Sequence, residues 1–168
     1  MADSSEGAAP GSTRLLGHAP AVIVHGLAAA IAAVGAAEPG RGIVLLSAPA
    51  AGLYAGAGWF AALAREAAAS RPGIPLLAVL DCADAAGAAL ASFRAGLRAI
   101  VFTGDAGMEA TLSAIAAECD ATLLRRAPPA LDLAGFQMGD QRWQRRLAAW
   151  LAEWRADGQA GTGNRPVG

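Results

Sequence analysis

The sequence predicts an α/β fold built on one parallel β-sheet. Between residues 42 and 105, three short apolar segments alternate with alanine-rich segments of helical length. Each apolar segment ends in small or polar residues and shows no polar alternation, which is typical of parallel strands that are buried on both faces. Strands and helices that alternate in this way form right-handed crossovers, with helices packed on the sheet.

The remaining elements extend this pattern towards both ends of the chain. Apolar runs predict five strands, at 21–25, 43–47, 76–81, 99–103 and 121–124. Alanine-rich runs with larger apolar residues at helical spacing predict helices, at about 26–36, 59–70, 85–95, 107–118 and 141–156. We expect Asp84 and Asp140 to cap the helices that follow them. Trp59 and Phe60 are expected to face the sheet.

Five strands with these connections predict a doubly wound parallel sheet in a flavodoxin-like, three-layer sandwich, with an extra C-terminal amphipathic helix. They are too few for a closed barrel of eight strands, and half of a barrel that dimerises is the alternative. Residues 20–157 are predicted to form this single domain. The two ends, 1–19 and 158–168, are rich in small and polar residues and are predicted to be disordered tails.

Composition and charge narrow the functional classes. Of the 168 residues, 55% are hydrophobic and 16% are charged, which allows a sizeable core. The net charge is −1, and no basic tract indicates binding to nucleic acid or to a membrane surface. All 13 basic residues are arginine, so a Schiff-base lysine and a phosphate-loop lysine are excluded.

The cysteines and the first residues of the chain indicate in which cellular compartment the protein works. Cys82 and Cys119 form neither a CxxC motif nor a metal-ligand spacing, which favours a reduced protein without a metal site. The first residues lack the pattern of a signal peptide. We therefore expect a soluble, cytoplasmic protein, and the sequence assigns no cofactor to it.

Three segments in the middle of the chain carry a family resemblance. They read Gly-Ile-Val-Leu-Leu-Ser-Ala-Pro at 42–49, Ala-Ser-Arg-Pro-Gly-Ile-Pro at 69–75 and Ala-Leu-Ala-Ser-Phe-Arg-Ala-Gly at 89–96. Together they resemble the receiver domain of response regulators, taken from its third strand onward. The last segment is similar to the helix and Ala-Gly turn before the final strand of a receiver. The resemblance spans about residues 42–118 and implies a flavodoxin-like fold.

The same resemblance places other residues at the receiver's functional positions. Ser47 stands where the family has its phosphoaccepting aspartate, and Asp81 stands where it has Thr or Ser. Thr103-Gly104 stands where the family has a lysine followed by proline. No acidic pair follows the first strand, which ends in His25. We therefore expect no aspartyl phosphorylation, and the resemblance supports the fold rather than the activity.

The carboxyl ends of the strands are the predicted place for a ligand, as in other open parallel sheets. His25 is the candidate general base there because histidine titrates near neutral pH, and Asp81 is the candidate acid or orienting group. Two arginines can bind a carboxylate or phosphate in bidentate fashion, or alternatively keep an edge strand soluble. The candidate ligand-binding residues at this edge are Ser47, Cys82, Thr103, Asp105, Arg125 and Arg126.

The glycine-rich turn before Trp59 is a second candidate for binding an anion. Gly56 and Gly58 allow the backbone to approach a ligand closely, and free amides at the start of the following helix favour negative charge. The turn lacks the spacing of a dinucleotide-binding fingerprint. A tight turn that lets Trp59 pack is therefore the structural alternative.

The C-terminal helix carries three of the four tryptophans of the chain. Trp143, Trp150 and Trp154 recur at helical spacing and form one apolar stripe, while arginines occupy the other face. Such a stripe either covers a face or edge of its own domain, or binds a partner protein or a second copy of the chain.

Two functions remain open from the sequence. The first is a small cytosolic binding or regulatory module that is receiver-like but lacks the phosphoacceptor aspartate and the lysine. The alternative is a small-molecule enzyme or sensor that binds an anionic ligand at the strand ends. Whether the protein is an enzyme is therefore left open.

Overall fold

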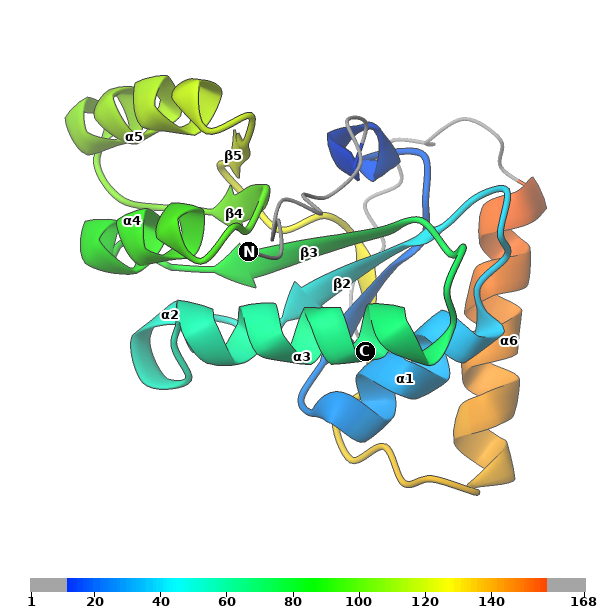
Figure 1. Ribbon diagram of the computed structural model, residues 1–168. Helices are drawn as coiled ribbons and strands as arrows, with labels where there is room; N and C mark the ends of the chain where they lie inside the picture. Colours follow the sequence, from blue (N-terminus) through cyan, green and yellow to red (C-terminus); the bar gives the residue numbers. More distant parts are fainter. Residues whose placement is uncertain (1–11, 157–168) are drawn as a thin grey trace, which may run out of the picture.

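A computed structural model describes residues 12–156, and one sheet of six parallel strands forms its centre (Figure 1). The strand order is β5-β4-β3-β2-β1-β6. This arrangement confirms the predicted α/β fold with a parallel sheet flanked by helices, with one strand more than expected. The strands are β1 (Ala21–Val24), β2 (Ile43–Ser47), β3 (Leu76–Asp81), β4 (Ala99–Val101), β5 (Thr122–Leu124) and β6 (Ala130–Asp132).

The extra strand, β6, lies in a segment where the sequence predicts no regular structure. It follows Pro128-Pro129 and contains three residues, too few to give a periodic signal. β6 pairs with β1 in parallel, from Ala21 opposite Ala130 to Ile23 opposite Asp132. The chain therefore returns from β5, at one edge of the sheet, to the far side of β1.

The helices lie close to their predicted positions. The short helix α2 falls in a segment predicted as a loop, and α3 begins two residues earlier than expected. The helical elements are the 3₁₀ turn η1 (Ser12–Leu15), α1 (Leu27–Ala36), α2 (Ala51–Tyr54), α3 (Ala57–Ser70), α4 (Ala86–Arg94), α5 (Ala106–Glu118) and α6 (Gln141–Ala156).

Of the two predicted helix caps, one is confirmed and the other is wrong. Asp140 caps α6, because its Oδ1 accepts a hydrogen bond from the amide of Arg142 at 2.8 Å. Asp84 does not cap α4, which begins at Ala86 after Ala85 and has no side-chain cap. The turn after β3 is instead organised by Asp81, whose carboxylate accepts a hydrogen bond from the Ala83 amide.

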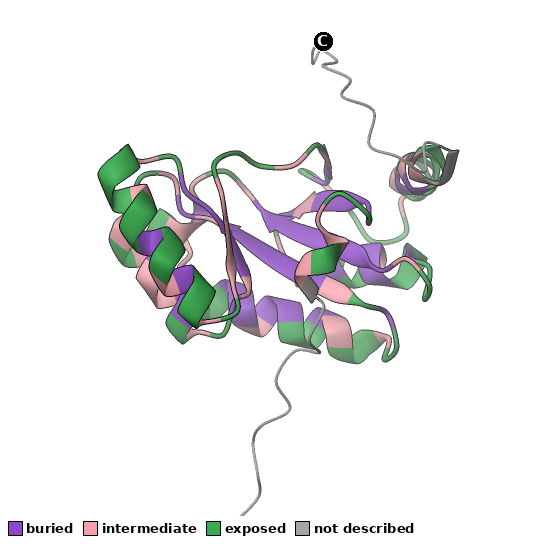
Figure 2. Cartoon of the chain, turned by 90° about the horizontal axis from the view of Figure 1, so that it is seen from above, coloured by how far each residue is buried: buried purple, intermediate pink, exposed green. Residues whose placement is uncertain are grey.

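Alternate residues of the strands separate into two apolar clusters, one on each face of the sheet. The first cluster holds Val22, Val24 and Leu45 together with residues of the helices. The second cluster holds the intervening strand residues, such as Val44 and Val79. Figure 2 shows the buried strands between elements whose outer sides are exposed.

The helices occupy the two faces of the sheet unequally. β1 to β5 are neighbours in sequence order, and right-handed connections then place successive helices on the same face. Residues of α1, α3, α4 and α5 accordingly belong to the first cluster, and α1 packs along α3 (Figure 1). α1, α3, α4 and α5 therefore lie on one side of the sheet, and the 3₁₀ turn η1 lies on the other.

The second face carries η1, and the connection from β5 to β6 has to cross the width of the sheet. From Leu124 to Ala130 the chain has six residue steps, which reach at most about 21 Å, whereas five strand spacings in a flat sheet measure about 24 Å. The sheet between β5 and β6 is therefore not flat, and its twist shortens the distance that the connection has to cross. Leu15 and Leu16 pack on this face, beside Leu124 and Ala130.

The predicted N-terminal tail needs a correction in its second half. Residues 12–15 form η1, which contacts β3, and the following Leu16 packs on the second face of the sheet. The apolar pair Leu15-Leu16 is the reason, since it buries hydrophobic surface that a disordered tail would expose. The other parts of the predicted tails, 1–11 and 158–168, lie outside the described residues.

The C-terminal helix packs on its own domain, so the tryptophans do not form a free partner-binding stripe as one prediction held. The indole of Trp150 donates to the carbonyl of Ala21 at 3.0 Å, and that of Trp154 donates to the carbonyl of His18 at 3.2 Å. Trp143 packs against Phe136. The stripe therefore secures α6 beside β1, which is the alternative that the sequence left open.

Gly42 provides a test of the close packing where β2 begins. It has φ of +75°, and a Cβ there would lie 2.4 Å from the carbonyl oxygen of Pro75. We expect Gly42→Ala to lower the free energy of unfolding by about 1–3 kcal/mol, because it adds backbone strain and a steric clash. Urea unfolding monitored by circular dichroism measures this change.

Gly40→Ala is the matched control, since a Cβ at Gly40 meets nothing within 4 Å. Its unfolding free energy should stay within about 0.5 kcal/mol of the wild type. Equal unfolding midpoints for the two variants would contradict the close approach at Gly42.

Candidate functional site

The predicted polar residues at the carboxyl ends of the strands do not meet in one place. The strand order puts His25 and Arg125 four strands apart, which corresponds to about 19 Å. His25 and Asp81 follow strands on either side of β2, about 10 Å apart. Asp81 is therefore not expected to contact His25 directly, and a joint catalytic role for the two residues stays a prediction.

The partner of His25 is Asp132, a residue that the sequence did not identify. Their side chains meet with 2.7 Å between His25 Nε2 and Asp132 Oδ1. Asp132 ends β6, and its Oδ1 also accepts a hydrogen bond from the Ala134 amide at 2.8 Å. The pairing of β6 with β1 thus holds the carboxylate beside the imidazole.

This pair lies where the direction of the chain connections changes. β1 leads through α1 to β2 on one side, whereas β6 lies on the other side and receives the chain from β5. Such a switch point is where open α/β sheets bind ligands. Both side chains are accessible there, with 39% of the His25 side chain and 48% of the Asp132 side chain exposed.

The start of α1 adds hydrogen-bond donors beside His25. Gly26 is the N-cap residue and supplies no side-chain cap, and the first amide of the helix to find an intrahelical acceptor is that of Ala30. The amides of the first turn are therefore free to face an anion. Together, these groups can hold and orient an anionic group, with His25 and Asp132 able to handle a proton.

Ser47 has a structural role rather than the predicted role in ligand binding. Its side chain is buried, donates a hydrogen bond to the Ala48 carbonyl at 3.0 Å and accepts one from the Asp81 amide at 2.9 Å. The hydroxyl therefore links the ends of β2 and β3. A buried hydroxyl engaged in this way is not free for a ligand.

Cys82 is also withdrawn from solvent, contrary to its predicted place in a ligand site. The residue is fully buried in the first cluster, and its thiol lies 3.6 Å from the Ser92 hydroxyl. Burial raises the pKa of the Cys82 thiol, an effect that the contact with Ser92 partly opposes. The thiol is therefore neutral and inert towards solutes.

Asp105 and the arginines are partly explained by local contacts. Asp105 caps α5, since its Oδ1 accepts hydrogen bonds from the Gly107 and Met108 amides at 3.0 Å. Arg125 forms an ion pair with Glu109 at 3.0 Å. Arg126 and Thr103 are exposed. All of these residues lie on the β4–β5 side of the sheet, away from His25.

The glycine-rich turn leads into α3 as predicted. Gly56 is the N-cap residue, with φ of +85°, and Gly58 lies in the first turn of the helix. A Cβ at either glycine would meet nothing within 4 Å. Close packing therefore does not require these glycines, and anion binding at this turn stays a prediction.

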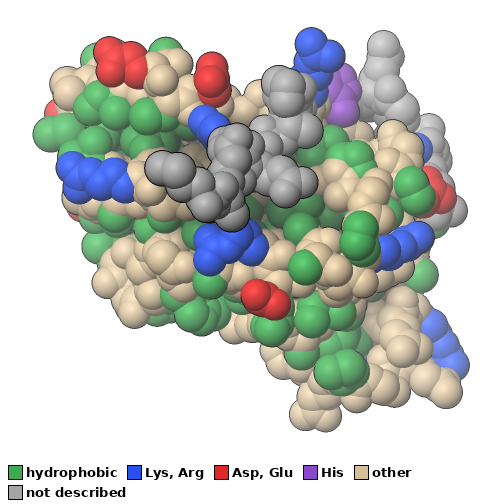
Figure 3. All heavy atoms as spheres, in the orientation of Figure 1, with side chains coloured by type: hydrophobic (Ala, Val, Ile, Leu, Met, Phe, Trp, Pro, Cys, Tyr) green, Lys and Arg blue, Asp and Glu red, His purple; other side chains and the backbone are tan. Residues whose placement is uncertain are grey.

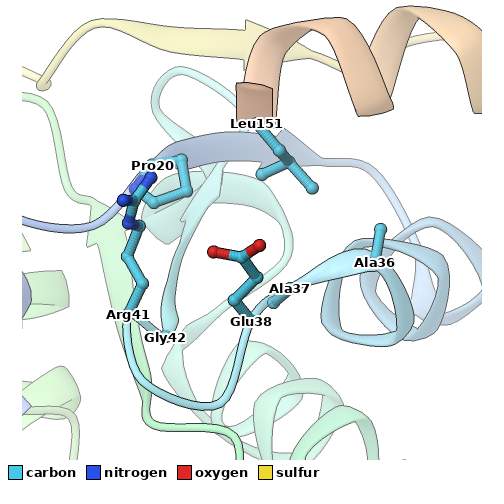
Figure 4. A pocket seen from close by; sticks show the side chains of 7 residues that line it. All are labelled: Pro20, Ala36, Ala37, Glu38, Arg41, Gly42 and Leu151. Carbon is cyan, nitrogen blue, oxygen red and sulfur yellow. The ribbon is translucent and has the colours of Figure 1, made fainter. Parts of the chain in front are cut away.

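A small hollow lies at the opposite end of the strands from His25 (Figure 4). Pro20, Arg41 and Leu151 enclose it, and the side chain of Glu38 points into it. Its volume is about 10 Å³, room for about one water molecule. One nitrogen of Arg41 is buried there without a hydrogen-bond partner among the described residues. The hollow is suited to a bound water rather than a substrate.

The outer surface of the helical layer carries a feature that the sequence reading missed. Trp59 was expected to face the sheet, but it is 45% exposed, whereas the neighbouring Phe60 is fully buried. On α1, which packs against α3, Leu27 and Ile31 are 42% and 38% exposed. We call Leu27, Ile31 and Trp59 the α1–α3 apolar surface. Figure 3 shows separate patches of apolar side chains in its lower part, where Figure 1 places these helices.

The sequence contained a signal for this surface. All ten residues of α1 are apolar or glycine. A helix that is apolar on every side is typically buried on every side. The outer face of α1 departs from that pattern, because Leu27 and Ile31 are partly exposed.

Comparisons with protein-family models, curated proteins and solved structures found no match to this chain. Between residues 12 and 156, no group of three His, Cys, Asp or Glu residues can hold a metal ion. In the same part of the chain, no helix is long and apolar enough to cross a membrane.

Cys82 allows a chemical test of this description. At pH 8 a soluble thiol reagent should modify Cys119, which is half-buried, at least about 100-fold faster than Cys82, because burial limits both access and thiolate formation at Cys82. Peptide mapping by mass spectrometry measures the two rates. Cys119→Ser is the control and should show no rapid reaction unless the protein is unfolded; a rapidly reacting thiol in that variant would refute the burial of Cys82.

Proposed function

We infer that the protein is a small binding or regulatory module that works without aspartyl-phosphate chemistry. It binds a partner protein on the α1–α3 apolar surface, next to His25. The observation that carries this proposal is the exposure of Leu27, Ile31 and Trp59 on two packed helices, one of which has no polar side chain.

The energetics favour a covered surface. Removing the exposed parts of Leu27 and Ile31 from water is worth about 1 kcal/mol each, and a tryptophan that fills a partner's pocket commonly contributes about 2 kcal/mol or more. Other exposed residues of α1, such as Ala28 and Ala36, are small and allow a partner to approach closely. The surface thus combines large apolar side chains, which can act as anchors, with small ones.

The hydrogen bonds at the carboxyl ends of β2 and β3 favour a binding function over aspartyl phosphorylation. Ser47 replaces a phosphoacceptor and is occupied by hydrogen bonds, and the carboxylate of Asp81 accepts from the Ala83 amide. The chain has no lysine. The receiver resemblance is consistent with a module that keeps such a scaffold for recognition. The free thiols of Cys82 and Cys119 suit a reducing cytoplasm, where we place the module.

The alternative function, a sensor or enzyme for a small anionic ligand, is favoured by one observation. His25 and Asp132 form a hydrogen-bonded pair at the switch point of the sheet, beside the free backbone amides at the start of α1. In this alternative, the imidazole and the helix start would hold a carboxylate or phosphate.

Binding on the α1–α3 apolar surface is tested with the Leu27→Ser/Trp59→Ser variant. Proteins that wild-type protein retains from an extract of its own cells are identified by quantitative mass spectrometry, purified and titrated by calorimetry. We expect the variant to bind the partner at least about 30-fold more weakly, because it loses a tryptophan anchor.

Met138→Ser is the matched control, since Met138 is 79% exposed and lies in the loop before α6. It should bind the partner as the wild type does. Equal affinity for the double variant and the wild type would reject this surface as the binding site.

The alternative is tested by a thermal-shift screen with inorganic phosphate, organic acids, nucleotides and sugar phosphates. A ligand present at about 100 times its Kd stabilises the protein by ~2.7 kcal/mol, which raises Tm by several degrees. If the alternative holds, His25→Ala abolishes the shift and Arg126→Ala keeps it, since Arg126 follows β5 at the far edge. A shift that survives in His25→Ala would place the ligand elsewhere.

A further inference from the structure

The two histidines of the chain have different surroundings. His25 Nε2 lies 2.7 Å from Asp132 Oδ1, whereas His18, in the segment between η1 and β1, is exposed and has no carboxylate against its ring among the described residues. A carboxylate that contacts one ring nitrogen holds the proton on that nitrogen. In neutral His25, the proton is therefore on Nε2 and the lone pair is on Nδ1.

The carboxylate that orients His25 is itself fixed. Asp132 Oδ1 accepts a second hydrogen bond from the Ala134 amide, and the register of β6 on β1 sets the position of the backbone. With 39% of its side chain exposed, His25 remains open to a reagent or to a donor protein. An oriented, accessible imidazole has the arrangement of a nucleophile supported by a third group.

We propose that His25 is a phosphoryl acceptor that reacts through Nδ1. The Nδ1 lone pair attacks the phosphorus of an energy-rich donor, such as a phosphoramidate or an acyl phosphate. The new N–P bond forms as the donor's P–N or P–O bond breaks, and the leaving group departs with that electron pair. The product is a phosphorylated imidazolium whose proton stays on Nε2, where the carboxylate of Asp132 stabilises the positive charge.

The surroundings of His25 also suit the product. The phosphoryl group would stand beside the uncapped start of α1, where backbone amides and the helix dipole stabilise negative charge. At this end of the sheet the side chains of Ser47 and Cys82 are buried, and the exposed Thr103 has no side-chain hydrogen bond to an acid or base among the described residues. Among the described strand ends, His25 is therefore the side chain best placed to carry a phosphoryl group.

This proposal goes beyond the binding function and does not depend on it. It rests on the contact between His25 and Asp132, whereas partner binding rests on Leu27, Ile31 and Trp59. Loss of partner binding in the Leu27→Ser/Trp59→Ser variant leaves the chemical reactivity of His25 unchanged. The two proposals can therefore fail separately.

The test uses the full chain and potassium phosphoramidate, which modifies histidine without a partner enzyme. Labelled sites are mapped by mass spectrometry, and ³¹P NMR of the modified protein identifies the phosphorylated nitrogen. His18 serves as the internal control for an exposed histidine without a carboxylate partner. We expect His25 to be labelled at least about 10-fold faster than His18, and only on Nδ1.

Asp132→Asn separates positioning from simple exposure. It removes the carboxylate charge while retaining an oxygen that can accept the Ala134 amide. We expect its His25 labelling rate to fall about 10-fold towards that of His18, with loss of the Nδ1 preference, while circular dichroism stays unchanged. His25→Gln should remove the label and leave His18 labelling as it was.

Three results at the histidines would overturn the proposal. They are equal labelling rates for His25 and His18, a product on Nε2 of His25 in the wild-type protein, and full-rate Nδ1 labelling in Asp132→Asn. A phosphoryl group found on Asp81 instead of His25 would equally reject it, and would restore the receiver type of chemistry.

Discussion

A short connection between β5 and β6 determines much of this structure. Residues 125–129 must carry the chain from one edge of the sheet to the other, and a flat sheet would be too wide for them. The twist that permits this crossing puts β6 beside β1. Asp132 then meets His25, and α6 follows along the same edge, where Trp150 and Trp154 donate to backbone carbonyls before and in β1. The candidate site therefore exists because the order of the strands places Asp132 beside His25.

The parts of the fold that could be predicted are those with long, repetitive signals. β2 and β3 are nearly continuous apolar runs that begin directly after Gly42 and Pro75, and α3 and α5 are long enough to show helical spacing. β6 gave no such signal, because three residues after two prolines have no period. Strand order was also beyond a single sequence, since the contacts that set it join distant residues.

Only one residue of the His25–Asp132 pair was predicted, because the contact joins residues that are distant in the sequence. His25 stood out because it ends a strand, but Asp132 lies 107 residues away and its Leu-Asp-Leu surroundings resemble a loop with buried apolar residues. Ser47, Cys82 and Asp105 were also placed at the correct edge. Their side chains face inward or cap local backbone, a distinction that depends on packing and cannot be read from the position of a strand end.

The pairing of β6 with β1 also sets the order in which the protein can assemble. β1 to β5 join neighbours along the chain, so their contacts close short loops and form early, as each unit leaves the ribosome. The contact between His25 and Asp132 closes a loop of more than a hundred residues and has to wait for the C-terminal part of the chain. A chain that lacks β6 therefore carries a His25 without its carboxylate partner, so the His25–Asp132 contact can form only after β6 has paired with β1.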